Sequence, residues 1–307
     1  MATVIHFVVF GFILSTAVGM LISWIDRRVT ACVQYRVGPP LFQPVFDLVK
    51  LSGKELLMPR GVSKIVFLGA PIVGLAGIML VSTLLCLVNI WPSRTFFGDL
   101  IVVVYLLVLP SLGIIVGGFA SRNPLASIGA SREMKLMLAY ELPFVIALFV
   151  PIIKSGPAIT LGAVINGQLV GGAILSSLSG VLSFFVILWC VQAKLGLVPF
   201  DVAEAETELA GGALIEYSGP ALALFKLTKI MMFFSLPFFM TIVYVGGIHI
   251  NSFFGLKGLL TFVLIVVLAV VIRNTNPRLR IDQIVKFFWG LITPIAIAAV
   301  FLAGRGL

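Results

Sequence analysis

The sequence predicts an all-α membrane protein with about eight transmembrane helices and one amphipathic helix at the membrane interface. Hydrophobic residues make up 60% of the 307-residue chain and charged residues only 11%, whereas soluble domains carry about 25% charged residues. A soluble protein of this composition would lack the polar side chains needed to cover its surface. Eight apolar stretches reach or approach the roughly 20 residues that a helix needs to cross a bilayer.

Each predicted span is a long apolar run with few charges. Because a chain inside lipid must satisfy its own backbone hydrogen bonds, we expect each run to be a helix. The runs are Val4–Ile25, Ile65–Ile90, Leu100–Phe119, Leu136–Ile153, Gly172–Val191, Leu222–Val245, Leu256–Ile272 and Phe287–Ala303. The first run is too long for a cleaved signal peptide and lacks its basic start, so it is interpreted as a span. We expect residues 1–307 to form a single membrane domain.

Basic residues predict how the chain is oriented. The segments that follow odd-numbered spans hold fifteen lysines and arginines, whereas the other connections and the tail hold four, Arg94, Lys154, Lys257 and Arg305. The positive-inside rule therefore places both termini outside and the odd-numbered connections in the cytoplasm. The same distribution accounts for the net charge of +9, so no nucleic-acid partner is needed to explain it.

A predicted helix at Val45–Leu57, in the long connection after the first span, is amphipathic. Phe46 and Val49 fall on one side of it, and Asp47 and Lys50 fall on the other. Such a helix can lie in the membrane interface. The alternative is a surface helix that packs on neighbouring loops.

The connection Gln192–Gly219 concentrates negative charge. It holds five of the twelve acidic residues of the chain, Asp201, Glu204, Glu206, Glu208 and Glu216. Pro199 suits the start of a helix and Gly211 its end, which would place Asp201, Glu204 and Glu208 on one face. Burial beside like charges raises carboxyl pKa values, so such groups can hold and pass protons near neutral pH. The alternative is a solvated acidic loop that binds a basic partner.

Three charged residues fall inside predicted spans, where charge is costly and often functional. Glu141 lies in the fourth span, and Lys226 and Lys229 lie one helical turn apart in the sixth. The lysines either extend toward the cytoplasm or pair with acidic residues in a polar path, with Glu216 as a candidate partner. Asp99 and Glu133 lie near span ends and are expected to be solvated.

The cysteines and histidines do not predict a metal or haem site. Cys32, Cys86 and Cys190 are far apart in the sequence, and His6 and His249 are isolated. This spacing matches no iron–sulfur, haem or zinc motif. We therefore expect no cofactor in this chain, and any redox centre would belong to partner subunits.

Several motifs resemble the membrane subunit that builds the quinone chamber of respiratory complex I. The resemblance is carried by VQYRVGP at Val33–Pro39, SREMKLMLAYE at Ser131–Glu141, VPFDVAEAETELAGGALIEYSG at Val198–Gly219 and the later NPRLRIDQIVKFFWG. A similar subunit occurs in membrane-bound energy-converting [NiFe] hydrogenases and in sulfane reductase complexes. Lys229 stands where the complex I pattern has a glutamate. This reversal of charge favours the hydrogenase and sulfane reductase branch.

The resemblance implies roles for particular residues. The family's polar connection from the redox arm into the membrane would include Glu141, Asp201, Glu204, Glu206, Glu208 and Glu216, with Lys226 and Lys229 beside it. Arg36 and Arg132 would lie near the hydrophilic arm. No residue of this chain is expected to be catalytic or to bind a metal.

The resemblance also implies partners and a location. Hydrophilic redox subunits would dock on the cytoplasmic loops and carry iron–sulfur clusters, with a nickel–iron centre in the hydrogenase branch. Antiporter-like and small membrane subunits would move H⁺ or Na⁺ across a prokaryotic plasma membrane. Three alternatives are a quinone-binding subunit of a complex I, a stand-alone transporter and a passive anchor.

Overall fold

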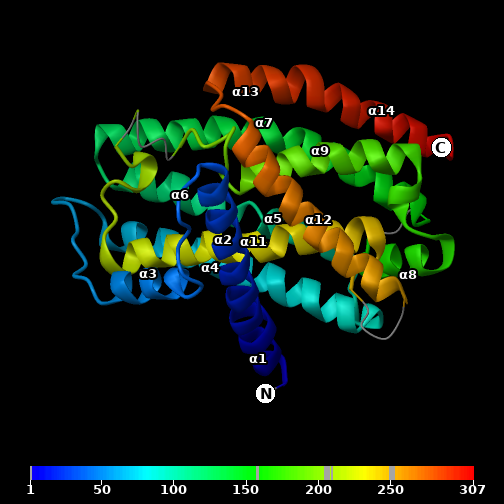
Figure 1. The fold of residues 1–307 in the computed structure, drawn as a ribbon, viewed down its shortest axis with the longest axis horizontal. Coiled ribbons are helices and arrows are strands. Elements are labelled where there is room, and N and C mark those ends of the chain that lie inside the picture. The colour runs from blue at the N-terminus through cyan, green and yellow to red at the C-terminus, as the bar shows by residue number, and fades with distance from the viewer. Residues whose placement is uncertain (1, 157–158, 204–207, 209, 249–252) are drawn as a thin grey trace.

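The first span is a long helical rod at the edge of the helix bundle. The computed structural model describes residues 2–156, 159–203, 208, 210–248 and 253–307. α1 (Ala2–His6), the π-helix η1 (Phe7–Leu14) and α2 (Ser15–Val33) follow one another without a break and cross the other helices at a steep angle (Figure 1). Only 22% of the most apolar stretch of this rod is buried. Most of its surface is therefore left for lipid or a partner.

α11 (Gly219–Val245) forms the centre of the bundle, because 94% of its most apolar stretch is buried. It packs against α2, α4 (Lys64–Ile90) and α12 (Phe253–Thr275). At the crossing with α2, a side chain on Gly19 would collide with the backbone oxygen of Ile230. Glycine at this position therefore lets the two helix backbones approach closely.

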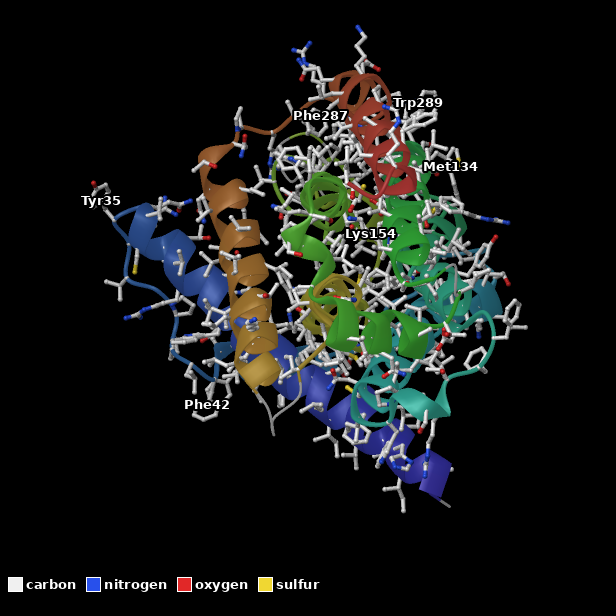
Figure 2. The ribbon with its side chains drawn as sticks, turned by 90° about the vertical axis from the view of Figure 1, so that its right-hand side faces the viewer. Tyr35, Phe42, Met134, Lys154, Phe287 and Trp289 are labelled. Carbon is white, nitrogen blue, oxygen red and sulfur yellow. The ribbon has the colours of Figure 1, made fainter. Side chains whose placement is uncertain are left out.

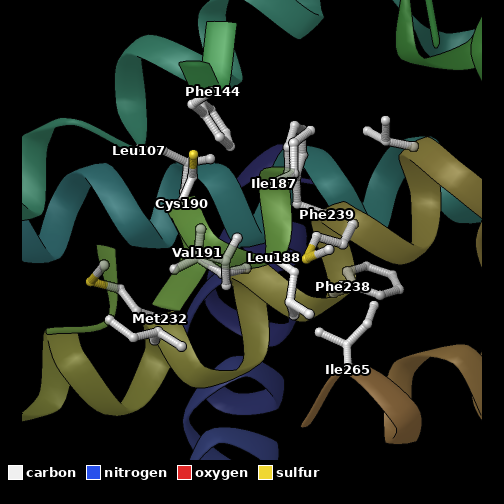
Figure 3. Packing of buried hydrophobic residues seen from close by; sticks show 14 of the residues in the cluster. Leu107, Phe144, Ile187, Leu188, Cys190, Val191, Met232, Phe238, Phe239 and Ile265 are labelled. Atoms are coloured by element: carbon white, nitrogen blue, oxygen red, sulfur yellow. The ribbon is translucent and has the colours of Figure 1, made fainter. Parts of the chain in front are cut away.

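A second group of helices surrounds α7 (Pro124–Lys154). α6 (Leu109–Ala120), α9 (Leu178–Lys194) and α14 (Thr293–Gly304) pack along it, while α5 (Asp99–Leu106) precedes α6, and α13 (Ile281–Phe287) with η5 (Phe288–Ile292) precedes α14. Side chains such as Phe144, Cys190 and Phe239 fill the space between these helices and α11 (Figure 3).

Shorter elements mark the two ends of the bundle. One end, the α3 end, carries α3 (Gln43–Ser52) and η4 (Gly212–Leu214). The opposite end carries η2 (Pro92–Arg94), α8 (Leu161–Gly171) and η3 (Ile174–Ser176) (Figure 1). The α3 end is the one that the distribution of basic residues assigns to the cytoplasm.

The helical prediction is confirmed, with changes in length. Among the described residues, seven helices are long and apolar enough to cross a membrane. The fifth predicted span corresponds to α9, an apolar helix of 17 residues. α7 begins at Pro124 rather than at Leu136, because the Asn123 side chain accepts a hydrogen bond from the backbone N–H of Leu125 and caps the helix there. The charged turns that end the apolar run are thus still helical.

The predicted amphipathic helix is present as α3, which ends at Ser52 rather than at Leu57. Phe46 and Val49 are exposed on its outer side, as an interfacial helix requires. Tyr35 and Phe42, in the segment that leads to it, lie at the edge of the molecule (Figure 2). Burial raises the pKa of Asp47, but hydrogen bonds from Arg27 and Gln43 outweigh it and hold this pKa below its ordinary value.

The predicted orientation can be tested by labelling a cysteine at position 63. Ser63 is exposed at the start of α4, on the α3 end. In intact cells that carry Ser63→Cys in a Cys32→Ser background, a membrane-impermeant maleimide is expected to leave position 63 unlabelled. Inside-out vesicles are expected to label it fully. Labelling from outside in intact cells would reverse the orientation.

Candidate functional site

Two adjoining cavities lie inside the α3 end of the bundle. The larger, here called the interfacial cavity, has a volume of about 490 Å³ and lies between α2, α3, α11 and α12. The smaller, the inner cavity, has a volume of about 40 Å³ and is lined by α7, α9 and α11 together with residues 195–203. Gly196, Asp201, Leu214, Phe225 and Lys229 line both. The two cavities therefore share a wall that contains an acid and a base.

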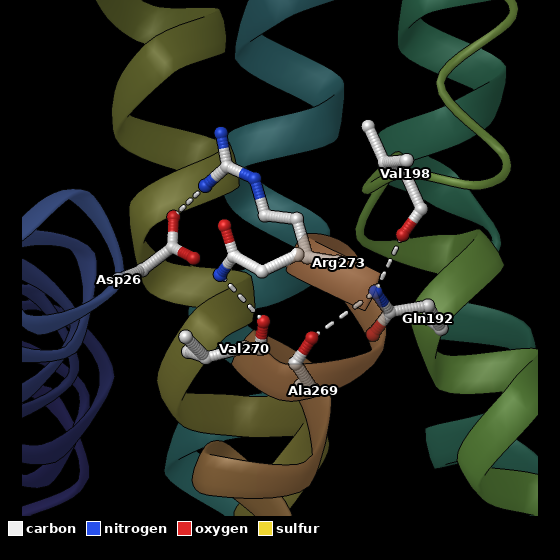
Figure 4. Close-up of polar contacts among 7 residues, drawn as sticks. Asp26, Gln192, Val198, Ala269, Val270 and Arg273 are labelled. Carbon is white, nitrogen blue, oxygen red and sulfur yellow. Dashed lines mark hydrogen bonds and ion pairs between the residues drawn. The ribbon is translucent and has the colours of Figure 1, made fainter. Parts of the chain in front are cut away.

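The segment that follows α9 is held firmly against the helices. The Gln192 side chain donates hydrogen bonds to the carbonyl oxygens of Val198 at 2.9 Å and Ala269 at 3.3 Å (Figure 4). Phe200 is fully buried in an aromatic cluster with Phe288, at a ring-centre distance of 5.0 Å. These contacts fix the position of Asp201, the next residue.

The far end of the same segment is also anchored. Tyr217 stacks on Phe67 at a ring-centre distance of 4.1 Å, and its hydroxyl donates to the Phe67 carbonyl oxygen at 3.0 Å. Burial raises the pKa of this hydroxyl, so it remains a neutral donor. A side chain on Gly129 of α7 would reach the backbone of Gly212 and Ala213, so glycine allows this loop to lie directly on α7.

Asp201 connects the two cavities to a third. It forms an ion pair with Arg278 at 2.9 Å, and its side chain is 19% exposed. A surface cavity of about 260 Å³ is lined by this pair and by a second ion pair, Arg132–Glu208, at 2.5 Å. Asp201 therefore lines all three cavities and stands between the surface of the α3 end and the interior.

The interior of this polar region contains a buried ion pair. The Lys194 ammonium lies 2.7 Å from a Glu141 carboxylate oxygen, joining α9 to α7. The Lys194 side chain has no exposed surface, and its ammonium also lies 4.9 Å from the centre of the Tyr140 ring and 4.6 Å from that of Phe144. The carboxylate and the two ring faces replace the water that the lysine has lost.

Glu133 and Lys229 lie between Asp201 and this pair. Both line the inner cavity together with Lys194 and Asp201. Glu133 is only 7% exposed, on the turns of α7 that precede the apolar run. The inner cavity thus brings two carboxylates and two lysines from four separate parts of the chain around a space that is large enough for water.

Further ion pairs lie on the α2 side of the interfacial cavity. Asp26 of α2 is paired with Arg273 at the end of α12 (Figure 4), and Arg27 is paired with Asp47 of α3 at 2.8 Å. The charge of Lys229 also acts on Asp26. These contacts tie α2 and α3 to the core of the bundle.

Comparison with known proteins identifies the family. The sequence profile of the family described as NADH dehydrogenase matches residues 5–304. The chain belongs to this family. A membrane subunit of the NADH-quinone oxidoreductase of Bacillus mycoides (strain KBAB4) is 30% identical, over 98% of this chain and 91% of that protein. Its counterpart in Anoxybacillus flavithermus (strain DSM 21510 / WK1) is 31% identical, over 90% and 86%.

A solved structure is similar along the whole chain. It is a chain of the membrane-bound sulfane sulfur reductase, described as an archaeal respiratory membrane complex. The TM-score is 0.88 at 26% sequence identity, with 99% of this chain and 100% of that chain covered. Both the resemblance to the complex I subunit and the multi-pass membrane location predicted from the sequence are thereby confirmed.

For this member of the NADH dehydrogenase family, part of the predicted acidic face is wrong. Asp201 follows the buried Phe200 in non-helical backbone, so it does not begin a helical face shared with Glu208. The two carboxylates instead pair with different arginines, Arg278 and Arg132. Glu204 and Glu206 lie outside the described residues.

The remaining predicted residues lie in varied surroundings. Glu216 accepts a hydrogen bond from the Asn123 side chain at 2.5 Å, and Arg36 is exposed between α2 and α3. Lys226 is exposed at the interfacial cavity, whereas Lys229, one turn further along α11, is half-buried. The two lysines therefore face one cavity at different depths.

Three polar residues are more buried than the sequence analysis predicted. Asp99 is 1% exposed and accepts a hydrogen bond from the Leu161 backbone N–H at 2.7 Å, and Glu133 is 7% exposed, so the expectation that both are solvated is wrong. Lys194 was counted only among the basic residues of the connections. Its position four residues after Cys190, on the buried side of α9, is the one signal in the sequence that indicates its burial.

Proposed function

We propose that this chain is the core membrane subunit of a complex I-like, redox-driven ion pump. It would anchor a hydrophilic electron-transfer arm and couple the redox reaction of that arm, hydrogen evolution or sulfane reduction, to translocation of H⁺ or Na⁺. The proposal is supported by membership of the family and by the similarity to a chain of the sulfane sulfur reductase complex. The reversed charge at Lys229 favours this branch over quinone chemistry.

The observation that carries the proposal is the position of Asp201. This carboxylate lines the surface cavity, the interfacial cavity and the inner cavity, and the inner cavity leads on to the Lys194–Glu141 pair. Charges in such surroundings are poorly screened, so a change at one group alters the proton affinity of the next. A charge change in the arm at the Asp201–Arg278 pair would therefore be felt by Lys229 and Glu133, and then by Glu141.

The surface of the α3 end is suited to a charged partner. Arg132, Glu208, Arg278, Arg280 and Asp282 line the surface cavity, so the described lining carries both signs of charge. Hydrophilic redox subunits docked here would hold the iron–sulfur clusters and, in a hydrogenase, a nickel–iron centre. Antiporter-like and small membrane subunits would take up the other end of the relay, since the bundle leaves apolar surface exposed along α2 and α12.

Reversal of charge at Lys229 tests this proposal. Lys229→Glu would place a negative charge in the wall shared by both cavities, beside Asp201. A unit charge 4 Å away is worth about 4 kcal/mol at an effective dielectric constant of 20. The ion gradient formed per turnover in vesicles is expected to fall several-fold, while the assembled complex retains electron transfer.

The control for this experiment is Lys50→Glu. Lys50 is exposed on α3 and lies outside the described lining of the three cavities. Its reversal is expected to leave the ion gradient per turnover unchanged. If Lys229→Glu pumped as well as this control, Lys229 would only extend toward the cytoplasm and would have no part in coupling.

A quinone-binding subunit is the second candidate. It is favoured by the names of the bacterial relatives, which are subunits of NADH-quinone oxidoreductases. The two candidates differ in what the purified complex reduces. Sulfane sulfur reduction or hydrogen evolution without quinone reductase activity would support the first, and quinone reduction would support the second.

A further inference from the structure

The interfacial cavity is large enough for a small organic group. Its volume of about 490 Å³ falls within the range of small-molecule sites, roughly 300–1,000 Å³. It lies at the α3 end, beside the exposed first span and the amphipathic α3. A molecule in this cavity would therefore be at the level of the lipid headgroups if α3 lies in the membrane interface.

The described lining of this cavity is positively charged. It contains five cationic side chains, Arg27, Lys226, Lys229, Arg273 and Arg278, and three carboxylates, Asp26, Asp47 and Asp201, so its net charge is +2. Each carboxylate forms an ion pair with one of the arginines. The positive charge that exceeds these pairs resides on the two lysines of α11.

Apolar surface continues from the mouth of the cavity. Ile25 and Val29 of α2 are 39% and 38% exposed, on either side of Arg27, and Phe46 of α3 is 61% exposed next to Asp47. Lys226 is exposed beside them. A ligand held here would thus meet a basic recess at one end and an apolar surface along α2 and α3 at the other.

These features match the two parts of a lipid, and we propose that the interfacial cavity binds the phosphate headgroup of an anionic phospholipid of the cytoplasmic leaflet. Lys226 and Lys229 would attract the phosphate, and the acyl chains would lie on α2 and α3. Basic pockets between membrane helices on the cytoplasmic side commonly bind anionic headgroups. The bound lipid would fill the gap between the first span and α11. This inference goes beyond the ion-coupling proposal and does not depend on it.

The test measures which lipid the purified complex retains. Wild type and Lys226→Gln would be transferred to nanodiscs that contain phosphatidylglycerol and phosphatidylcholine, and bound lipid would be counted by native mass spectrometry. Wild type is expected to retain phosphatidylglycerol in preference to phosphatidylcholine. Loss of the lysine charge is expected to weaken phosphatidylglycerol binding about fivefold.

Two matched variants complete the test. Lys226→Arg keeps the charge and is expected to bind phosphatidylglycerol like wild type, and Lys50→Gln removes a charge from the same end of the molecule without affecting binding. Equal binding by Lys226→Gln and wild type would overturn the proposal, as would equal retention of the two lipids. A cavity that binds inorganic phosphate but not phosphatidylglycerol, or that retains a neutral quinone instead, would also overturn it.

Discussion

Replacement of Lys194 with methionine is expected to destabilise the protein by about 3–5 kcal/mol. The substitution keeps a long apolar side chain in α9 but leaves the Glu141 carboxylate, now 2.7 Å from the ammonium, without its cation. It also removes the contacts of that ammonium with the Tyr140 and Phe144 rings. Because the Glu141 side chain retains 24% exposure, we expect the lower part of this range.

The measurement is the free energy of unfolding in a mild detergent, followed by the loss of helical circular dichroism. The matched control is the double variant Lys194→Met with Glu141→Gln, which removes both charges and keeps the shape of both side chains. It is expected to recover most of the lost stability, since the penalty comes from an unpaired buried charge. Wild-type stability of Lys194→Met alone would show that the Lys194–Glu141 pair is not a structural element of the bundle.

The fold was largely predictable because lipid imposes a simple rule on sequence. Long apolar runs become helices, so hydropathy located the spans, including the 17-residue α9. The rule fails at helix ends, where polar residues are compatible with both helix and loop. α7 begins at Pro124 because of the Asn123 cap and the contacts of its first turns with α6 and η4, which hydropathy does not record.

The candidate site was only partly predictable, for a related reason. Asp201, Glu141 and Lys229 were found because charge in or beside a span is rare. Glu133 and Lys194 were missed because they lie where an apolar run ends, and a charged residue there is usually solvated. Their burial depends on packing between α7, α9 and the segment after α9. That packing joins residues distant in sequence and has no local pattern.

The division of the acidic residues also required the structure. A helix from Pro199 would have placed Asp201 and Glu208 on one face, but Phe200 inserts into the core and sets the path of the chain. The partners of these carboxylates, Arg278 and Arg132, come from the segment after α12 and from α7. Neither pairing follows from spacing along the sequence.

The ion-coupling account predicts a large effect for Glu133→Gln. Glu133 is buried and lines the inner cavity with Asp201, Lys229 and Lys194. Glutamine keeps the size of the side chain but cannot take up or release a proton, so a relay through this cavity would be interrupted. The complex is expected to assemble and to keep electron transfer to soluble acceptors. The matched control is Glu55→Gln, which changes an exposed glutamate at the same end.

The most direct test is the ion gradient formed per turnover by each complex in sealed vesicles, normalised to the amount of assembled complex. The account predicts that this ratio falls several-fold for Glu133→Gln and is unchanged for Glu55→Gln. An unchanged ratio for Glu133→Gln, with assembly and electron transfer intact, would contradict a relay through the inner cavity and would leave this subunit as an anchor for its partners.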